Sequence, residues 1–324
     1  MQKTNSANTV KRWAVILAGG DGTRLQPLTR LISGDDRPKQ FCSLFGGPTL
    51  LELTKNRLGL LLPAEQTITI VTRSHERFYK PLLGSQSSRQ LVVQPNNKGT
   101  AAAIILGLLR VTHLSPDAAV AFFPSDHYIS NDVRFMLHVD AAFSQAKRHA
   151  NMIVLLGMKP ASPEVEYGWI EPESPFSDEH SRAVSSVRRF WEKPSKANAR
   201  KLMRQGCLWS SFVMVGRADA FLQLIRLALP ELYQSLFRVA VTLETADQAR
   251  ALSEVYSRIP ASNFSTEVLA LWPDRLLVRQ VSDVGWSDLG EPSRALSAIR
   301  RNRSDVRAAR AYGRVAATGA DTQR

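Results

Sequence analysis

The sequence predicts an α/β protein with a largely parallel sheet covered by helices on both faces. Two observations support this prediction. Short runs of apolar, β-branched residues alternate along the chain with longer segments in which apolar residues recur at helical spacing. The short runs are apolar throughout rather than alternately polar, which is typical of strands buried on both faces. In such open sheets, ligands bind at the carboxyl ends of the strands.

The first half of the chain alternates regularly between the two patterns. The expected strands are Trp13–Leu17, Thr67–Thr72, Leu91–Gln94, Ala118–Phe123 and Met152–Gly157. The expected helices are Thr49–Leu62, Ser74–Leu83, Thr100–Leu114 and Asn131–His149. Because a helix separates each of these strands from the next, we expect right-handed crossovers between parallel strands.

The second half has a mixed pattern. Extended stretches are expected at Tyr167–Glu171, Val184–Glu192 and Leu208–Val215, then helices from about 218 to 256, and a last strand at Leu276–Val281. The polar segment Pro172–Arg182 is expected to form a surface loop. With neither a repeat nor a long linker, we expect one domain over 12–298, between a flexible N-terminus (1–11) and a basic, disordered tail (299–324).

Composition excludes several classes of protein. The chain has 324 residues, an ordinary apolar fraction and only two cysteines, too few for a disulfide framework. It contains no apolar run long enough to span a bilayer and no signal peptide, so we expect a cytoplasmic protein without a membrane partner. The net charge of +13 is concentrated partly at the two ends. A nucleic-acid partner is therefore not favoured, because a basic end is usually only solvated.

A glycine cluster follows the first strand directly. Gly19, Gly20 and Gly22 lack a Cβ, so their backbone can approach a phosphate closely and offer it N–H groups, and Arg24 adds a cation with paired donors. A tight turn beside a surface arginine is the alternative. The spacing matches neither the Walker loop nor the dinucleotide fingerprint, which argues against a nicotinamide dehydrogenase.

A lysine follows the glycine cluster after a short connection. Pro38 stiffens the backbone beside Lys39 and so restricts where its ammonium can point. A structural lysine is the alternative, and it is weakened by the proximity of the glycine cluster.

Together these motifs resemble the family of nucleotidyltransferases that make nucleotide sugars. The family signature stands here as GGDGTRLQPLT, from Gly19 to Thr29, followed by Pro38-Lys39. The resemblance implies a Rossmann-like three-layer α/β/α nucleotidyltransferase fold with a mostly parallel mixed central sheet. It also implies that a nucleoside triphosphate and a sugar-1-phosphate are joined with release of pyrophosphate. The variant Pro-Lys-Gln-Phe resembles the mannose-1-phosphate guanylyltransferase branch, which implies GTP, mannose-1-phosphate and GDP-mannose.

Two aspartates lie where a metal is expected. Asp126 follows the strand ending at Phe123, and Asp288 lies in a glycine-flanked turn after the last strand. Carboxylates at strand ends suit Mg²⁺, which takes oxygen ligands together with bridging phosphates. An aspartate that caps a turn is the alternative for either one alone. The resemblance implies that both bind Mg²⁺.

The resemblance assigns further roles residue by residue. Arg24, Lys39 and Lys193 are the expected catalytic cations, Arg24 and Lys39 on the triphosphate and Lys193 on the sugar phosphate. Glu192 is expected on the sugar hydroxyls, with Gly168 and Ser211 also at the sugar. The residues expected to bind the nucleotide are Leu17, Gly19, Gly20, Gly22, Thr23, Gln94, Gly99 and Thr100.

The chain departs from the family pattern on the sugar and base side. The usual Trp-Asn-Ser-Gly stands here as Trp209-Ser-Ser-Phe212, and the usual Gly-Arg-Asn-Thr-Ala as Asn97-Lys-Gly-Thr-Ala101; Asn263 replaces a usual acidic residue. Two alternatives therefore stay open. One is a uridylyl-, thymidylyl- or adenylyltransferase acting on glucose-1-phosphate; the other is a non-catalytic regulatory subunit. A homo-oligomer is compatible with either.

Overall fold

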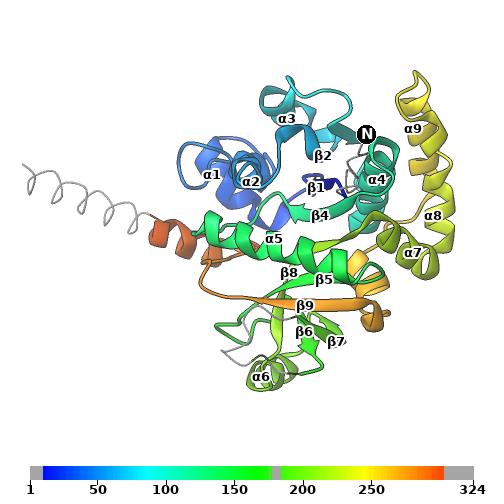
Figure 1. The fold of residues 1–324 in the computed structure, drawn as a ribbon. Helices are drawn as coiled ribbons and strands as arrows, with labels where there is room; N and C mark the ends of the chain where they lie inside the picture. The colour runs from blue at the N-terminus through cyan, green and yellow to red at the C-terminus, as the bar shows by residue number, and fades with distance from the viewer. Residues whose placement is uncertain (1–9, 175, 177–183, 303–324) are drawn as a thin grey trace, which may run out of the picture.

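A computed structural model describes residues 10–174, 176 and 184–302, and shows one nine-stranded mixed sheet (Figure 1). Its strands are β1 (Arg12–Leu17), β2 (Thr67–Thr72), β3 (Leu91–Gln94), β4 (Ala119–Pro124), β5 (Ile153–Met158), β6 (Gly168–Pro172), β7 (Val184–Glu192), β8 (Leu208–Arg217) and β9 (Leu276–Val281). Their order across the sheet is β3-β2-β1-β4-β8-β5-β9-β7-β6. All nine strands lie within two residues of the predicted ranges.

The sheet has a parallel half and a half with reversed strands. β1 pairs in parallel with β2 and β4, β2 with β3, and β5 with β9. β8 runs antiparallel between β4 and β5, and β6 and β7 pair antiparallel at the far edge. The mixed α/β fold is confirmed. The antiparallel share of the sheet is larger than the strand pattern indicated, because β8 runs antiparallel to both of its neighbours and β7 runs antiparallel to β6 and β9.

The helices form two layers around the sheet. Their bounds are α1 (Gln26–Ser33), α2 (Leu50–Leu58), α3 (Glu76–Leu83), α4 (Gly99–Leu114), α5 (Asp132–Arg148), α6 (Lys196–Arg204), α7 (Ala218–Ala228), α8 (Pro230–Phe237) and α9 (Gln248–Arg258). One apolar cluster joins the sheet to α4, α7, α8 and α9, and a second joins it to α2, α3, α5 and α6. In β1, Trp13 and Val15 belong to the first cluster, whereas Ala14 and Ile16 belong to the second. This alternation explains why the strand is apolar throughout.

Two of the labelled helices, α1 and α6, were not predicted. In α1, Leu31 is 83% exposed, and in α6 only Ala199 and Leu202 are buried. Neither helix therefore carries a wide apolar stripe. The predicted helical region from 218 to 256 is divided into α7, α8 and α9, with Pro230 at the first turn of α8.

The ends of the predicted domain fall partly outside the described residues. A helix over 292–302 runs across the expected boundary at 298, and its Ala295 and Ala298 pack on Leu25 and Leu289. Residues 1–9, 303–324 and most of the predicted loop at 172–182 lie outside the part of the chain that the structure describes.

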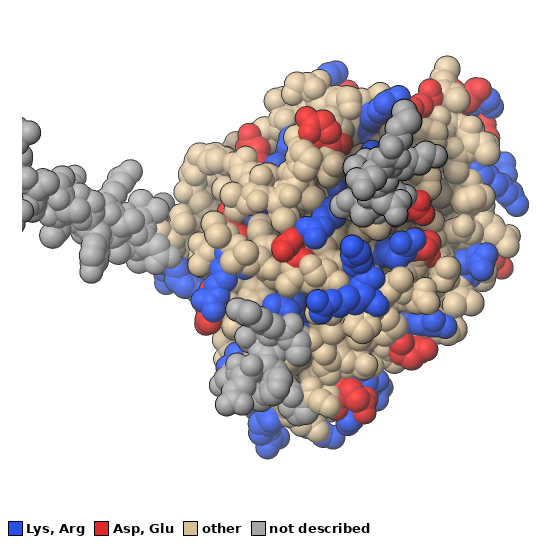
Figure 2. All heavy atoms as spheres, viewed as in Figure 1, with Lys and Arg blue, Asp and Glu red and all other residues tan. Residues whose placement is uncertain are grey.

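Basic side chains gather across the middle of the face shown in Figure 2, with acidic side chains interspersed. Arg12, Lys147, Arg148 and Arg217 line one shallow cavity. Arg12 pairs with Asp140, and Arg217 with Asp219, so part of this positive charge is neutralised. Within the described ranges, no helix combines the length and apolar character that crossing a membrane requires.

Candidate active site

The carboxyl ends of β1, β3 and β4 open onto a cavity of about 460 Å³. Seven of the residues predicted for the site line it: Leu17, Gly19, Gly20, Gln94, Gly99, Thr100 and Asp126. The parallel strands thus bring together motifs that lie far apart in the sequence, at the edge of the sheet where ligands are expected.

The glycine loop lies against β2 and β3. A Cβ on Gly19 would lie 2.7 Å from Gln94 Nε2 and 2.8 Å from Thr72 Oγ1, closer than any side chain can approach. The Thr72 hydroxyl donates a hydrogen bond to the Gly19 carbonyl at 2.9 Å. Gly20 has nothing within 4 Å of its Cβ position, so its backbone faces open space. Gly19 is required for packing, and Gly20 leaves room for a ligand.

Gln40 fixes the glycine loop through two hydrogen bonds, a role that the sequence did not predict. Its buried amide donates to the Ala18 carbonyl at 3.1 Å and to the Gly20 carbonyl at 2.7 Å. Gly22 adopts φ +62, and the predicted Thr23 begins a short 3₁₀ helix. These two residues do not line the cavity; Gly22 instead lies where a Cβ would be 3.2 Å from the backbone nitrogen of Lys39.

Lys39 contacts both residues that were predicted to bind the metal. Its ammonium lies 3.2 Å from Asp126 Oδ2 and donates to the carbonyl of Asp288 at 2.8 Å. A longer bond of 3.3 Å reaches the carbonyl of Leu289. The Lys39 side chain is only 12% exposed. Its charge is therefore held in one position by groups from both halves of the chain.

Asp288 lies in a network of donors. Its Oδ1 accepts hydrogen bonds from the Tyr167 hydroxyl at 3.0 Å, the Gly290 N–H at 2.9 Å and Arg294 Nε at 3.0 Å. Burial alone would raise the pKa of Asp288, but the neighbouring His127, Gly290 N–H, Arg294 and Lys39 together lower it. The carboxylate is thus held ionised. Sequence analysis missed Tyr167 and Arg294, since neither belongs to the motif around Asp288.

His127 is not placed as a cationic group. Burial lowers its pKa to about 4, and its Nδ1 accepts a hydrogen bond from Trp286 Nε1 at 3.1 Å. Across the described part of the chain, no group of three or more His, Cys, Asp or Glu side chains could hold a metal ion by itself. Two carboxylates still fit Mg²⁺, which is commonly bound by one or two carboxylates together with substrate phosphates.

Arg24 and Lys193 meet on one acidic residue that the sequence did not single out. Arg24 Nη1 lies 3.0 Å and Lys193 Nζ 3.7 Å from the same oxygen, Oε2 of Glu166. The cationic side chains are 56% and 52% exposed, and Glu166 is 34% exposed. Two predicted phosphate-binding cations are therefore close together and accessible, with a carboxylate between them.

Two of the predicted sugar-side residues lie on the β6–β7 pair, where Gly168 is directly opposite Glu192. A Cβ on Gly168 would lie 2.9 Å from the Phe190 ring and 3.1 Å from Glu192 Oε2, so only glycine fits without displacing these groups. Burial raises the pKa of Glu192, and the charge of Lys193 opposes that shift.

Ser211 does not face the site. The structure buries it completely, and its hydroxyl donates to the Leu156 carbonyl at 2.6 Å. The prediction that Ser211 contacts the sugar is therefore not supported by this geometry. Its hydroxyl satisfies backbone groups where β8 bulges away from β5.

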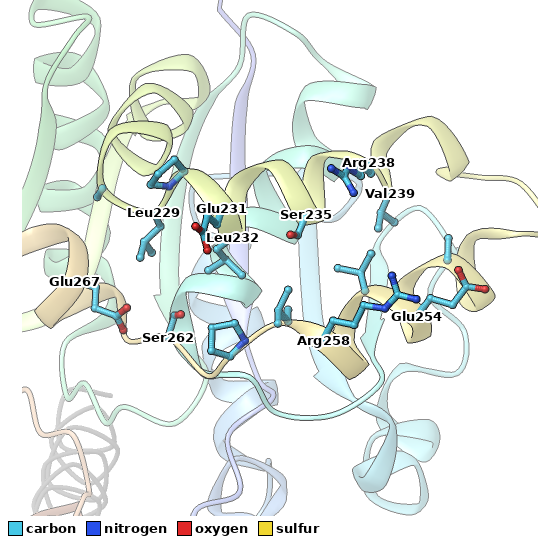
Figure 3. A pocket seen from close by; sticks show the side chains of 16 residues that line it. Leu229, Glu231, Leu232, Ser235, Arg238, Val239, Glu254, Arg258, Ser262 and Glu267 are labelled. Atoms are coloured by element: carbon cyan, nitrogen blue, oxygen red, sulfur yellow. The ribbon is translucent and has the colours of Figure 1, made fainter.

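A second cavity of about 600 Å³ lies between α8 and α9 (Figure 3). Ser262 and Glu267 line both cavities. The Ser262 N–H donates to the Lys98 carbonyl at 3.0 Å, and the Ala101 N–H donates to the Ser262 carbonyl at 3.2 Å. The segment Gln94–Thr100, in which the base of the nucleotide is expected to bind (the base segment), is thus fixed by a segment more than 150 residues later in the chain. No local sequence signal marks that contact.

The fold and the site define a class: an α/β protein with a glycine loop and an aspartate at the carboxyl ends of parallel strands, and a lysine that connects this aspartate to the backbone of a second one. The chain belongs to the nucleotidyl transferase family, whose model matches residues 13–304. The family resemblance found in the motifs is thereby confirmed.

Individual relatives agree with this assignment. The chain is 29% identical over 288 residues to the xanthan biosynthesis protein XanB of Xanthomonas campestris pv. campestris (strain B100), covering 87% of this chain and 58% of that protein. It is 27% identical over 282 residues to a mannose-1-phosphate guanylyltransferase of Escherichia coli, covering 85% of this chain and 59% of that protein. The chain thus spans less than two thirds of the length of these relatives.

A solved structure also resembles this one. It is described as mannose-1-phosphate geranyltransferase from Thermus thermophilus and is 30% identical, with a TM-score of 0.74. The likeness covers 87% of this chain and 77% of that one. A UDP-glucose pyrophosphorylase complexed with UDP-glucose, at 17% identity and a TM-score of 0.55, shares the fold.

Proposed function

We propose that this chain transfers a nucleoside monophosphate from a nucleoside triphosphate to a sugar-1-phosphate and releases pyrophosphate. The preferred substrates are GTP and mannose-1-phosphate, which give GDP-mannose. The observation that supports this most is the convergence of the glycine loop, Lys39, Asp126 and Asp288 at one edge of the sheet. The name of the Escherichia coli relative supports the choice of substrates.

The reaction would be an in-line displacement. An oxygen of the sugar phosphate attacks the α-phosphorus of the triphosphate; a new P–O bond forms, and the bond to the β-phosphate oxygen breaks as pyrophosphate leaves. Such transfers depend mainly on positioning and charge neutralisation. Backbone N–H groups of the glycine loop would hold the triphosphate. Arg24 was expected on the triphosphate, but it shares Glu166 with Lys193. These two cations would together bring the sugar phosphate close to the triphosphate, with Glu166 displaced from at least one of them.

Mg²⁺ is the proposed cofactor. Asp126 and Asp288 would hold it, and the two fit because each carboxylate is anchored, that of Asp126 by Lys39 and that of Asp288 by Tyr167, the Gly290 N–H and Arg294. When bound, the ion would neutralise phosphate charge that accumulates during the transfer. Lys39 would fix the Asp126 carboxylate and the backbone that carries Asp288.

The test is pyrophosphate release with Mg²⁺, in which GTP, ATP, UTP and dTTP are each combined with mannose-1-phosphate or glucose-1-phosphate. Turnover confined to GTP with mannose-1-phosphate is the expected result. Turnover with another pair would support the proposed transfer reaction and overturn the assignment of GTP and mannose-1-phosphate as substrates.

A second candidate is a regulatory subunit that binds the nucleotide sugar without turnover. Ser210 and Phe212, which replace the family's asparagine and glycine, favour it. Binding of GDP-mannose in calorimetry, combined with no pyrophosphate release from any pair, would support this candidate over the enzyme.

A further inference from the structure

Phe212 has a backbone conformation that is unusual for its side chain. Its φ is +58°, in the left-handed region that favours glycine. A bulky aromatic residue in this region is strained and persists only when its surroundings impose the conformation. The related family pattern has glycine at this position, so the aromatic side chain distinguishes this chain.

The strain lies within a bulge of β8. Leu155 pairs with Met214 and Gly157 with Ser210, so three residues of β5 lie opposite five residues of β8. The Ser210 hydroxyl accepts the N–H of Phe212 at 3.3 Å. Ser211 Oγ accepts the N–H of Val213 at 3.2 Å. The two serines therefore satisfy backbone groups that the bulge removes from the ladder, and such bulges re-aim side chains near active sites.

The bulge places Phe212 in the wall of the 460 Å³ cavity. Phe212 is half-buried and packs against the apolar cluster that contains α4 and α7. Among the described residues that line this cavity, it is the only aromatic one. The other walls come from the glycine loop, from the segment between Gln94 and Thr100, and from 261–263.

We propose that Phe212 is a nucleotide-binding residue whose ring provides the stacking surface for the base. This inference rests on the proposed function, because a nucleoside triphosphate is the ligand. Every nucleobase has a flat π face that can stack on an aromatic ring, and this stacking does not depend on the hydrogen-bonding groups at the edge of the base. Purines have a larger face than pyrimidines. The strained backbone thus coincides with the only aromatic residue among the described residues that line the cavity.

Two variants separate the effect of losing the aromatic ring from the effect of relieving the backbone strain. Phe212→Gly and Phe212→Ala both remove the ring, but only glycine relieves the positive φ. Both should raise the KM for GTP about tenfold, since loss of one base-stacking aromatic typically weakens binding by that order. Both should leave the KM for the sugar phosphate within about twofold, and Phe212→Gly should melt at a higher temperature than Phe212→Ala.

Two further variants serve as references. Phe212→Tyr keeps an aromatic face and should retain the wild-type KM for GTP. Phe237→Ala removes a ring on α8 that is 49% exposed and lies outside the cavity lining, so it should change neither KM.

The dissociation constant for GTP, measured by calorimetry without the sugar phosphate, separates the two proposals. If the wild type binds GTP and Phe212→Gly binds it equally well, the stacking role is overturned and the proposed function stands. A rise confined to the KM for the sugar phosphate would also overturn the stacking role. If the wild type binds none of the four triphosphates, both proposals fail.

Discussion

The two sides of the site hold their charged groups differently. Beside β1 and β4, Lys39 is 12% exposed and contacts Asp126 and the carbonyl of Asp288. Beside β7, Arg24 and Lys193 are 56% and 52% exposed, and both approach Glu166. Folding alone therefore fixes the groups proposed for metal and triphosphate. The cations proposed for the sugar phosphate keep partners that a ligand can displace. Substitutions on the first side should affect stability and activity together, and those on the second should affect activity alone.

The largest effect is expected for Asp126→Ala. It removes one of two carboxylates proposed for Mg²⁺, so pyrophosphate release should fall by about three orders of magnitude, because the charge on the phosphates is no longer neutralised. Asp274→Ala, at an acidic side chain that is 69% exposed, is the matched control. Normal turnover in Asp126→Ala would contradict the metal assignment.

Lys39→Met should reduce both activity and stability. The substitution leaves Asp126 and the carbonyls of Asp288 and Leu289 without their shared donor. We expect a loss of about 1–3 kcal/mol in the free energy of unfolding, the usual effect of leaving buried polar groups unpaired. Turnover should fall about a hundredfold, because the groups that Lys39 contacts are no longer held in position. Urea denaturation measures the first effect. Unchanged stability would show that Lys39 does not organise this side of the site.

Lys193→Ala should change activity without changing stability. Its ammonium is exposed and 3.7 Å from Glu166, and exposed ion pairs contribute about 0–1 kcal/mol. The KM for the sugar phosphate should rise about tenfold while the KM for GTP stays constant, and the effect should shrink with added salt. Lys196→Ala, at an exposed lysine on α6, is the control. A marked loss of stability in Lys193→Ala would contradict the idea that substitutions on this side of the site affect activity alone.

The smallest effect is expected for Glu192→Gln, measured as stability against pH. Burial raises the pKa of Glu192, so its ionised form disfavours the folded state at neutral pH. Protonation removes this penalty as the pH falls through the raised pKa. Glu192→Gln should therefore be slightly more stable than the wild type near pH 7, by less than about 1 kcal/mol, and the difference should shrink in acid. Glu173→Gln, at an exposed carboxylate, should show no such pattern. A pH-independent difference would contradict the shifted pKa.

The sequence predicted the parts of the site that lie at strand ends. The glycine loop follows β1 and Asp126 follows β4, and the parallel pairing of these strands brings both to one edge. Alternation between strand and helix was enough to predict this arrangement, because it fixes strand direction. Roles given to Lys193 and Glu192 rested on motif resemblance, and they stay predictions.

The remaining contacts depend on tertiary structure that no local pattern encodes. Glu166 lies 142 residues from Arg24 in the sequence, and Gln40 reaches back 20 residues to the Gly20 carbonyl. Ser211 was expected at the sugar, but the β8 bulge directs its hydroxyl to the Leu156 carbonyl. A bulge changes which side chains of a strand face a site, and the sequence shows neither its position nor its direction.

The contact between Gly99 and Ser262 has a consequence for how the protein is made. A Cβ on Gly99 would lie 2.3 Å from the Ser262 carbonyl oxygen, so the two backbones fit together only because one of them is glycine. During synthesis, the base segment leaves the ribosome long before the residues that hold it. β9 also arrives late and takes its place between β5 and β7. A nascent chain ending before residue 262 would carry every glycine of the first loop and still lack a finished nucleotide cavity. Completion of the cavity therefore waits until residues 261–263 have been made.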